Sequence, residues 1–130
     1  MPFEVFNRTS FRAYRNPMCT IQKRGTFSLN AAAFGAIRGD HEVTDTLYVV
    51  LLFDRSRKLV GFRRASEDEP NAYPVRKQAN SNSYLVAGKI FCRHYEIQIG
   101  QARRYKARDL GEGVVGFSLD DEGKEVSREG

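Results

Sequence analysis

The sequence has little of the material from which catalytic and metal sites are built. Its 130 residues include only two cysteines and two histidines, with no CxxC, HExxH or GxSxG motif and no glycine-rich phosphate loop. Cys92 and His94 lie two positions apart on an expected helix, which directs their side chains to opposite sides. The acidic run at 120–122 lies in a polar tail, where solvated carboxylates are expected. The sequence therefore predicts no catalytic residue, no metal site, no cofactor and no enzymatic activity.

Long hydrophobic runs are also missing. The longest, at 47–53 (LYVVLLF), is far shorter than the roughly 20 residues that a membrane-spanning helix needs. Residues 1–15 mix phenylalanine with arginine and lack the apolar segment of a signal peptide. Two cysteines allow at most one disulfide, which a chain of this length does not need. These absences predict a cytoplasmic protein with reduced thiols and no membrane partner.

The charge that is present is basic and unevenly distributed. The chain has 21 lysines and arginines against 16 acidic residues, for a net charge of +5. Residues 76–108 contain eight basic residues and one acidic residue, whereas residues 109–130 contain seven acidic and two basic ones. A basic body attracts phosphates, although charge of this size also serves solubility alone. The acidic tail could fold back and compete with an anionic partner.

Length and composition indicate one domain spanning residues 1–130. The hydrophobic fraction of 41% is sufficient for a packed core. A charged loop at 67–71 separates two halves, at 18–64 and 73–119. Before them, residues 1–17 are expected to form an extended arm, and after them residues 120–130 a polar, frayed tail. Four aromatic residues of the arm could anchor it to a neighbouring surface: Phe3, Phe6, Phe11 and Tyr14.

Local patterns predict the same order of elements in both halves. Apolar and polar residues alternate as in half-buried strands, and Asn30 is a good N-cap for a short helix that Gly39 ends. Phe34 and Ile37 should face the core from that helix. The expected strands are 19–23, 26–29, 47–53, 58–63, 73–78, 83–87, 103–108 and 114–119, with helices at 31–38 and 88–96 and turns at 24–25, 54–57, 80–82 and 109–113.

The two halves also share residues, which favours an internal duplication. The sequence Val-Gly-Phe at 60–62 recurs at 115–117, and three further pairs lie 57 positions apart: Leu29 and Val86, Phe34 and Phe91, Tyr48 and Tyr105. Chance patterning is the alternative. A single ββαββ unit cannot cover its own sheet face, but two can interleave. We therefore expect a mainly β fold, a small closed β-barrel made of two pseudo-repeated ββαββ units with two short helices.

Residues 18–64 contain several short motifs in a fixed order: Arg24-Gly25, Ser28-Leu29-Asn30, the helix expected at 31–38, and Gly39-Asp40. In this order the first half resembles the AbrB/MazE/SpoVT swapped-hairpin family. The resemblance implies an interleaved barrel of the cradle-loop type and DNA binding by a transcription regulator or antitoxin. Asn30 stands where the family has proline, and Ala31 and Phe34 stand where it often has basic residues. Only Arg24 therefore carries over as a DNA contact.

Basic residues on strands and turns are the other candidates for nucleic-acid binding. In a strand at 103–108, Arg104, Lys106 and Arg108 share one face and could form a track for phosphates, while Tyr105 could stack or fill the core. Arg55 and Arg57, in the first hairpin, could extend this surface. The alternative is an edge strand that its charges keep soluble.

These observations lead to two hypotheses of function. The first is a nucleic-acid-binding protein, a DNA-associated factor similar to transcription regulators, which uses Arg24, Arg55, Arg57, Arg104, Lys106 and Arg108. The second is a non-enzymatic module for protein interaction or assembly, which uses the barrel as a scaffold and the aromatic arm as a docking element. A homodimer stays open, because an internal duplication removes the need for a second copy without forbidding one.

Overall fold

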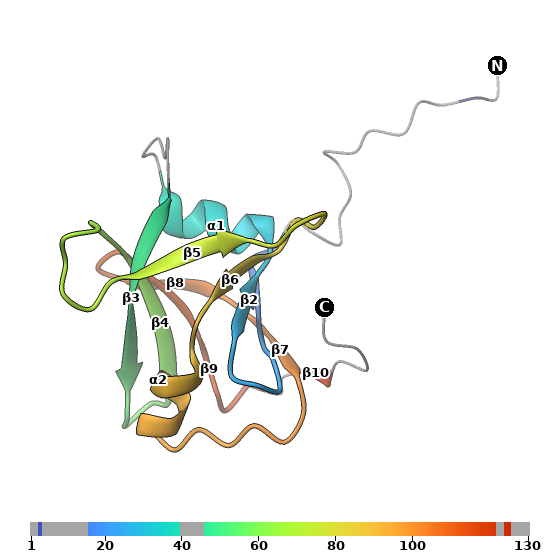
Figure 1. Ribbon diagram of the computed structural model, residues 1–130. Helices are drawn as coiled ribbons and strands as arrows, with labels where there is room; N and C mark the ends of the chain where they lie inside the picture. The colour runs from blue at the N-terminus through green and yellow to red at the C-terminus, as the bar shows by residue number, and fades with distance from the viewer. Residues whose placement is uncertain (1–2, 4–15, 40–45, 122–123, 126–130) are drawn as a thin grey trace.

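A computed structural model describes residues 3, 16–39, 46–121 and 124–125 (Figure 1). Short strands connected by tight turns dominate it, as the alternating patterns predicted. The described elements are β1 (Met18–Ile21), β2 (Phe27–Leu29), α1 (Ala31–Arg38), β3 (Leu47–Asp54), β4 (Leu59–Ala65), β5 (Tyr73–Lys77), β6 (Tyr84–Val86), α2 (Lys89–His94), β7 (Arg103–Lys106), β8 (Arg108–Gly111), β9 (Val114–Ser118) and β10 (Lys124–Glu125).

The strands form one antiparallel sheet that curls into a nearly closed barrel. Their order is β10-β7-β1-β2-β6-β5-β3-β4-β9-β8. β7 and β8 lie near opposite ends of this order, yet only Ala107 separates them in the chain. Their continuity brings the two ends of the sheet together. The prediction of a mainly β barrel with two short helices is confirmed.

The strand pairing is the same when the two halves of the chain are exchanged. β2 pairs with β6 through Phe27 opposite Val86 and Leu29 opposite Tyr84. Phe27 and Tyr84 lie 57 positions apart in the sequence, as do Leu29 and Val86, so each residue pairs with its neighbour's counterpart. β4 pairs with β9 around Gly61, which lies opposite its counterpart in the other half. The pairing of β1 with β7 has its counterpart in the pairing of β5 with β3, because β5 corresponds to β1 and β3 corresponds to β7. This symmetry is what a duplication would leave, and the duplication itself stays a hypothesis.

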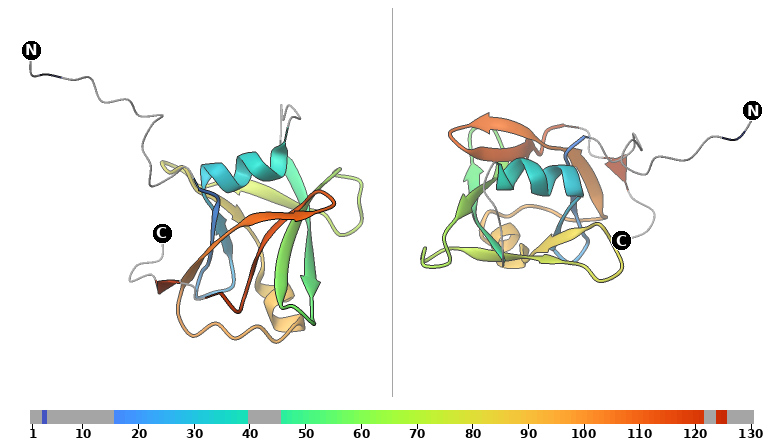
Figure 2. Two further views of the ribbon diagram at one scale, coloured as in Figure 1. Left: turned by 180° about the vertical axis from the view of Figure 1, so that it is seen from behind. Right: turned by 90° about the horizontal axis from the view of Figure 1, so that it is seen from above.

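The two helices lie at opposite ends of the barrel (Figure 2). α1 begins at Asn30, whose side-chain Oδ1 accepts a hydrogen bond from Ala33 N at 2.9 Å, and it ends before Gly39 at φ +64°. α2 begins after Gly88, where an added Cβ would lie only 2.5 Å from the ring of Phe27. Glycine thus lets α2 start directly on the core.

Aromatic side chains fill the space inside the barrel. Phe27 and Phe62 meet edge to face at 5.4 Å between ring centroids, and Tyr105 stacks on Phe117 at 4.7 Å. Ile37 of α1 is buried as predicted, whereas Phe34 is half-buried and stacks on Tyr84 of β6. The core therefore uses residues from both halves, so neither half covers its sheet alone.

Three expectations about local structure need correction. The strand expected at 103–108 is broken at Ala107, which is buried where β7 passes into β8. The turn expected at 109–113 is confined to 112–113, because β8 continues to Gly111 before the chain reverses. The tail at 120–130 is not wholly frayed, since Lys124–Glu125 forms β10 and pairs with β7.

Other expectations fall beyond the part of the chain that is described. Phe6, Phe11 and Tyr14 of the arm lie outside the described residues, and Phe3 is exposed. Among the described helices, none has the length and apolar character required to cross a membrane.

Candidate nucleic-acid interface

Two turns and α2 meet at one end of the barrel and bring basic residues together. At Gly25, in the β1–β2 turn, an added Cβ would lie 2.9 Å from Lys89 Cα, so this turn touches the start of α2. The guanidinium of Arg55, in the β3–β4 turn, lies 4.9 Å from the ring centroid of Tyr95, directly after α2. Figure 1 shows both turns beside α2. We call this surface the basic end, with the cations Lys23, Arg24, Arg55, Arg57, Lys58, Lys89 and Arg93.

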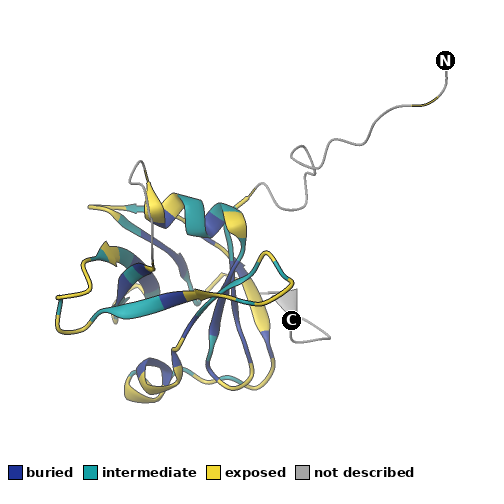
Figure 3. Ribbon diagram, turned by 45° about the horizontal axis from the view of Figure 1, so that its top comes forward, coloured by how far each residue is buried: buried dark blue, intermediate teal, exposed yellow. Residues whose placement is uncertain are grey.

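All seven cations of the basic end are exposed. Figure 3 shows α2 exposed on its outer side and buried where it meets the barrel. Arg24 Nε donates to Thr26 Oγ1 at 3.4 Å within its own turn. In the described part of the three segments, the acidic residues are Asp54 and Glu96. Cations therefore predominate on this surface, as on surfaces that contact phosphates.

Asp54 organises the β3–β4 turn. Its Oδ1 accepts hydrogen bonds from the backbone N–H of Ser56 at 3.0 Å and of Arg57 at 3.1 Å, while its Oδ2 accepts from Arg57 Nε at 2.9 Å. The backbone hydrogen bond from Arg57, followed by the side-chain hydrogen bonds from Ser56 and Arg57, lowers the pKa of Asp54 to about 2. Arg57 is thus held in place, and its charge is partly balanced.

Arg104, Lys106 and Arg108 lie elsewhere, along β7 and β8. All three are exposed, and Tyr105 between them is buried against Phe117, as the alternation predicted. β7 is not an edge strand, because it pairs with β1 on one side and with β10 on the other. These three cations form an outward row, which we call the β7–β8 row.

The acidic tail approaches the β7–β8 row. Arg108 Nη1 lies 3.6 Å from Asp121 Oδ2, and β10 runs beside Arg103 and Arg104. Both partners of the ion pair are more than half exposed, so the pair itself contributes little stability. The Asp121 carboxylate nevertheless places a negative charge beside the cations of the β7–β8 row.

Of the six residues predicted from the sequence, three lie at the basic end and three in the β7–β8 row. Arg24, Arg55 and Arg57 belong to the first group, although their two turns are far apart in the sequence. Lys89 and Arg93 were missed as binding residues. Their i, i+4 spacing places them on one side of a short helix, but only the packing of α2 brings them to Arg24 and Arg55.

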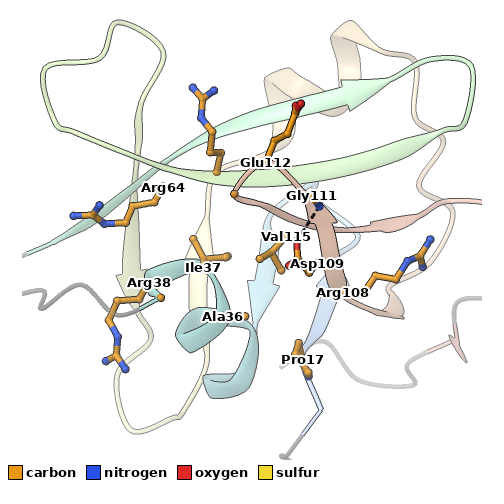
Figure 4. Close-up of a pocket in the computed structure, with 13 residues that line it drawn as sticks. Pro17, Ala36, Ile37, Arg38, Arg64, Arg108, Asp109, Gly111, Glu112 and Val115 are labelled. Carbon is orange, nitrogen blue, oxygen red and sulfur yellow. Dashed lines mark hydrogen bonds between the residues drawn. The ribbon is translucent and has the colours of Figure 1, made fainter.

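A second arginine-rich region lies at the other end of the barrel. A pocket of about 600 Å³ there is lined by α1, the end of β4 and the β8–β9 turn. Figure 4 shows Arg38, Arg64 and Arg108 pointing to different sides, away from the apolar lining of Ile37 and Val115. These guanidinium groups do not converge on one ligand. The basic end is therefore the better candidate for phosphate binding.

The described residues hold no metal centre: no three histidine, cysteine or acidic side chains gather at one point. Cys19 and Cys92 are free and buried. Burial raises the pKa of the Cys19 thiol, and burial also raises the pKa of Cys92 to about 11. Neither group is thereby activated as a nucleophile.

Comparisons of the chain with protein-family models, curated proteins and solved structures find no match. The resemblance to the AbrB/MazE/SpoVT family thus stays a prediction that rests on the residues quoted for it.

Proposed function

We propose that this protein binds nucleic acid through its phosphates, with the basic end as the main contact surface. The observation that carries the proposal is that α2 contacts two turns, and that these three segments carry seven exposed cations. Basic residues of this kind release condensed counterions when they contact phosphates, which drives binding. The β7–β8 row is a second, weaker contact surface, because Arg108 already forms an ion pair with Asp121.

The biological role that we propose is that of a DNA-associated factor similar to transcription regulators, in keeping with the resemblance of residues 18–64. Arg24 links the two arguments, since it matches the family's Arg-Gly turn and lies at the basic end. Binding to phosphates alone carries no sequence information. Regulation of particular genes would require further contacts to base edges.

Salt dependence tests the proposal directly. Fluorescence anisotropy would follow the binding of a labelled 20-base-pair duplex and a labelled 20-nucleotide single strand, at about 50 and about 200 mM salt. Combining Arg24→Ala, Arg55→Ala and Lys89→Ala should weaken binding and flatten the plot of log K against log salt by about one unit per lost contact. The same experiment with Arg104→Ala, Lys106→Ala and Arg108→Ala should give a smaller change.

A matched control separates a local surface from net charge. Combining Arg38→Ala, Arg64→Ala and Arg76→Ala removes the same charge from exposed positions away from α2. We expect this control to leave the slope nearly unchanged. Equal losses in both variants would mean that net charge, and not the basic end, governs binding. If neither oligonucleotide binds at 50 mM salt, the proposal is wrong, and the positive charge serves solubility alone.

A further inference from the structure

A groove lies beside α2, next to the basic end. Its volume is about 420 Å³, within the range of about 300–1,000 Å³ typical of small-ligand sites. We call it the α2 groove. Its lining includes Ile90, His94 and Tyr95 from α2 and its C-cap, Asn71 from the segment before β5, Tyr73 from the start of β5, and Leu51 from β3.

The lining of the α2 groove is more apolar than polar, and part of it faces solvent. Ile90 is 71% exposed, an unusual fraction for a large aliphatic side chain. His94 is also exposed and meets Tyr95 edge to face at 4.6 Å, while Tyr73 is half-buried. Apolar and aromatic groups that stay open to water in this way favour a ligand with a flat apolar face.

Positive charge borders this apolar lining. Lys89 and Arg93 belong to the same helix as Ile90 and His94, and the Arg55 guanidinium covers the ring of Tyr95. A flat apolar ligand that enters the groove would therefore have cations beside it. Single-stranded nucleic acid combines these two properties, since its bases expose their faces and its phosphates lie alongside. A duplex keeps its base faces stacked inside and offers only their edges.

We propose that the α2 groove binds a base of single-stranded nucleic acid whose phosphates lie along the basic end. This inference rests on the proposed function and names the form of nucleic acid that the same surface prefers. His94 and Tyr73 stack on the base, and the Asn71 amide, which also lines the groove, offers hydrogen bonds to the base edge. Stacking tolerates any base, so the preference concerns strand form more than sequence.

A tryptophan reporter tests the position of the base. The chain contains no tryptophan, so Tyr73→Trp introduces a single emitter into the groove. Oligothymidine should quench this emission, because a base stacked in the groove contacts the indole. Tyr84→Trp is the matched control, since Tyr84 is also a half-buried tyrosine but stacks on Phe34 near α1. Its emission should not change.

Affinity measurements test the contribution of the groove. Ile90→Ala and His94→Ala alter exposed side chains, so the barrel should stay folded, which thermal melting would verify. His94→Ala should weaken single-strand binding about tenfold, the order expected for the loss of one stacking contact. Ile90→Ala should weaken it less, because an aliphatic side chain packs on a base without stacking. The salt slope and the affinity for a duplex should not change, because no phosphate contact is removed.

The outcomes distinguish this inference from the proposed function. If neither strand form binds at low salt, the proposed function fails, and the groove proposal fails with it. If both forms bind with equal affinity and the groove variants have no effect, the proposed function stands and the groove proposal is overturned. If oligothymidine binds to Tyr73→Trp without quenching its emission, the groove proposal is also overturned. A protein partner would then be the alternative occupant of the groove.

Discussion

At the scale of the residue, Asp54 links the pH of the solution to the shape of the basic end. Its carboxylate accepts hydrogen bonds from Ser56 and Arg57, and these bonds lower its pKa from 3.8 to about 2. A group whose pKa is lower in the folded state stabilises that state above its unfolded pKa. This stability is lost as the pH falls through the folded value.

We therefore expect Asp54→Asn to lower the thermal midpoint at pH 7. The difference from the natural chain should shrink between about pH 4 and about pH 2, since protonation removes the same charge from the natural chain. Thermal melting followed by circular dichroism at several pH values checks this. Asp68→Asn, in the exposed loop after β4, is the control. A difference that persists unchanged at pH 2 would contradict the role of the carboxylate.

The two thiols allow a second test at this scale. Cys19 is fully buried and Cys92 is 3% exposed, and burial raises the pKa of both. Because the thiolate is the reactive form, both cysteines should resist iodoacetamide at pH 8 in the folded protein and react after denaturation. Mass spectrometry counts the labelled sites. Rapid labelling of Cys92 alone would instead show that α2 opens from the barrel.

At the scale of the element, Asn30 joins α1 to β1. Its Oδ1 accepts hydrogen bonds from Ala33 N and from Met18 N at 3.0 Å, and its Nδ2 donates to Asn16 O at 2.8 Å. Asn30→Ala removes all three hydrogen bonds and should lower the free energy of unfolding by about 1–2 kcal/mol. Asn30→Asp keeps both acceptor bonds and should cost less. Urea denaturation measures the two changes, and equal losses would contradict the capping role.

The contact between β4 and β9 depends on glycine. An added Cβ at Gly116 would overlap the backbone oxygen of Val60, whereas one at Gly35 in α1 would meet nothing within 4 Å. Gly116→Ala should therefore separate the strands and destabilise the fold by about 1–3 kcal/mol. Gly35→Ala should stabilise it by about 0.5–1 kcal/mol, because alanine favours the helix. Urea denaturation measures the change in the free energy of unfolding for both variants. Changes of the same sign in the two variants would contradict this explanation.

At the scale of the whole molecule, the described part of the acidic tail, Asp121 and β10, lies against the basic β7–β8 row. Residues 121–130 carry four acidic and two basic residues, so their removal raises the net charge from +5 to +7. It also removes β10 and frees Arg108 from Asp121. We expect the truncated chain to bind oligonucleotides more tightly and with a steeper salt dependence. Anisotropy titrations measure both, and unchanged affinity would show that the tail does not compete.

The two ends of the barrel differ in charge, which only the whole molecule shows. The β3–β4 turn contributes Arg55 and Arg57 to the end that holds α2. The corresponding β8–β9 turn lies near α1 and carries Glu112, with Asp109 beside it. The pairing of the strands is symmetric, whereas the two turns differ in charge. Near α1, Asp109 and Glu112 offset part of the charge of Arg38, Arg64 and Arg108. We therefore expect an anionic partner at the end that holds α2.

Much of the fold could be predicted because it depends on neighbouring residues. Asn30 and Gly39 bound α1 at the expected positions, since capping and positive φ are local properties of the chain. The alternation around Tyr105 correctly separated outward cations from the core. The break at Ala107 was missed, because closing the barrel requires β7 and β8 to join different neighbours, and no local signal records that requirement.

The sequence by itself determined the basic charge, the strand periodicity, the helix caps and six candidate cations, because composition and short-range pattern specify these properties. Only the tertiary structure decided which cations meet. Lys89 lies more than sixty residues from Arg24, and the two come together because β1, β2 and α2 pack on a shared core. The α2 groove arises in the same way, from side chains of separate elements that burial and strand pairing bring to one surface.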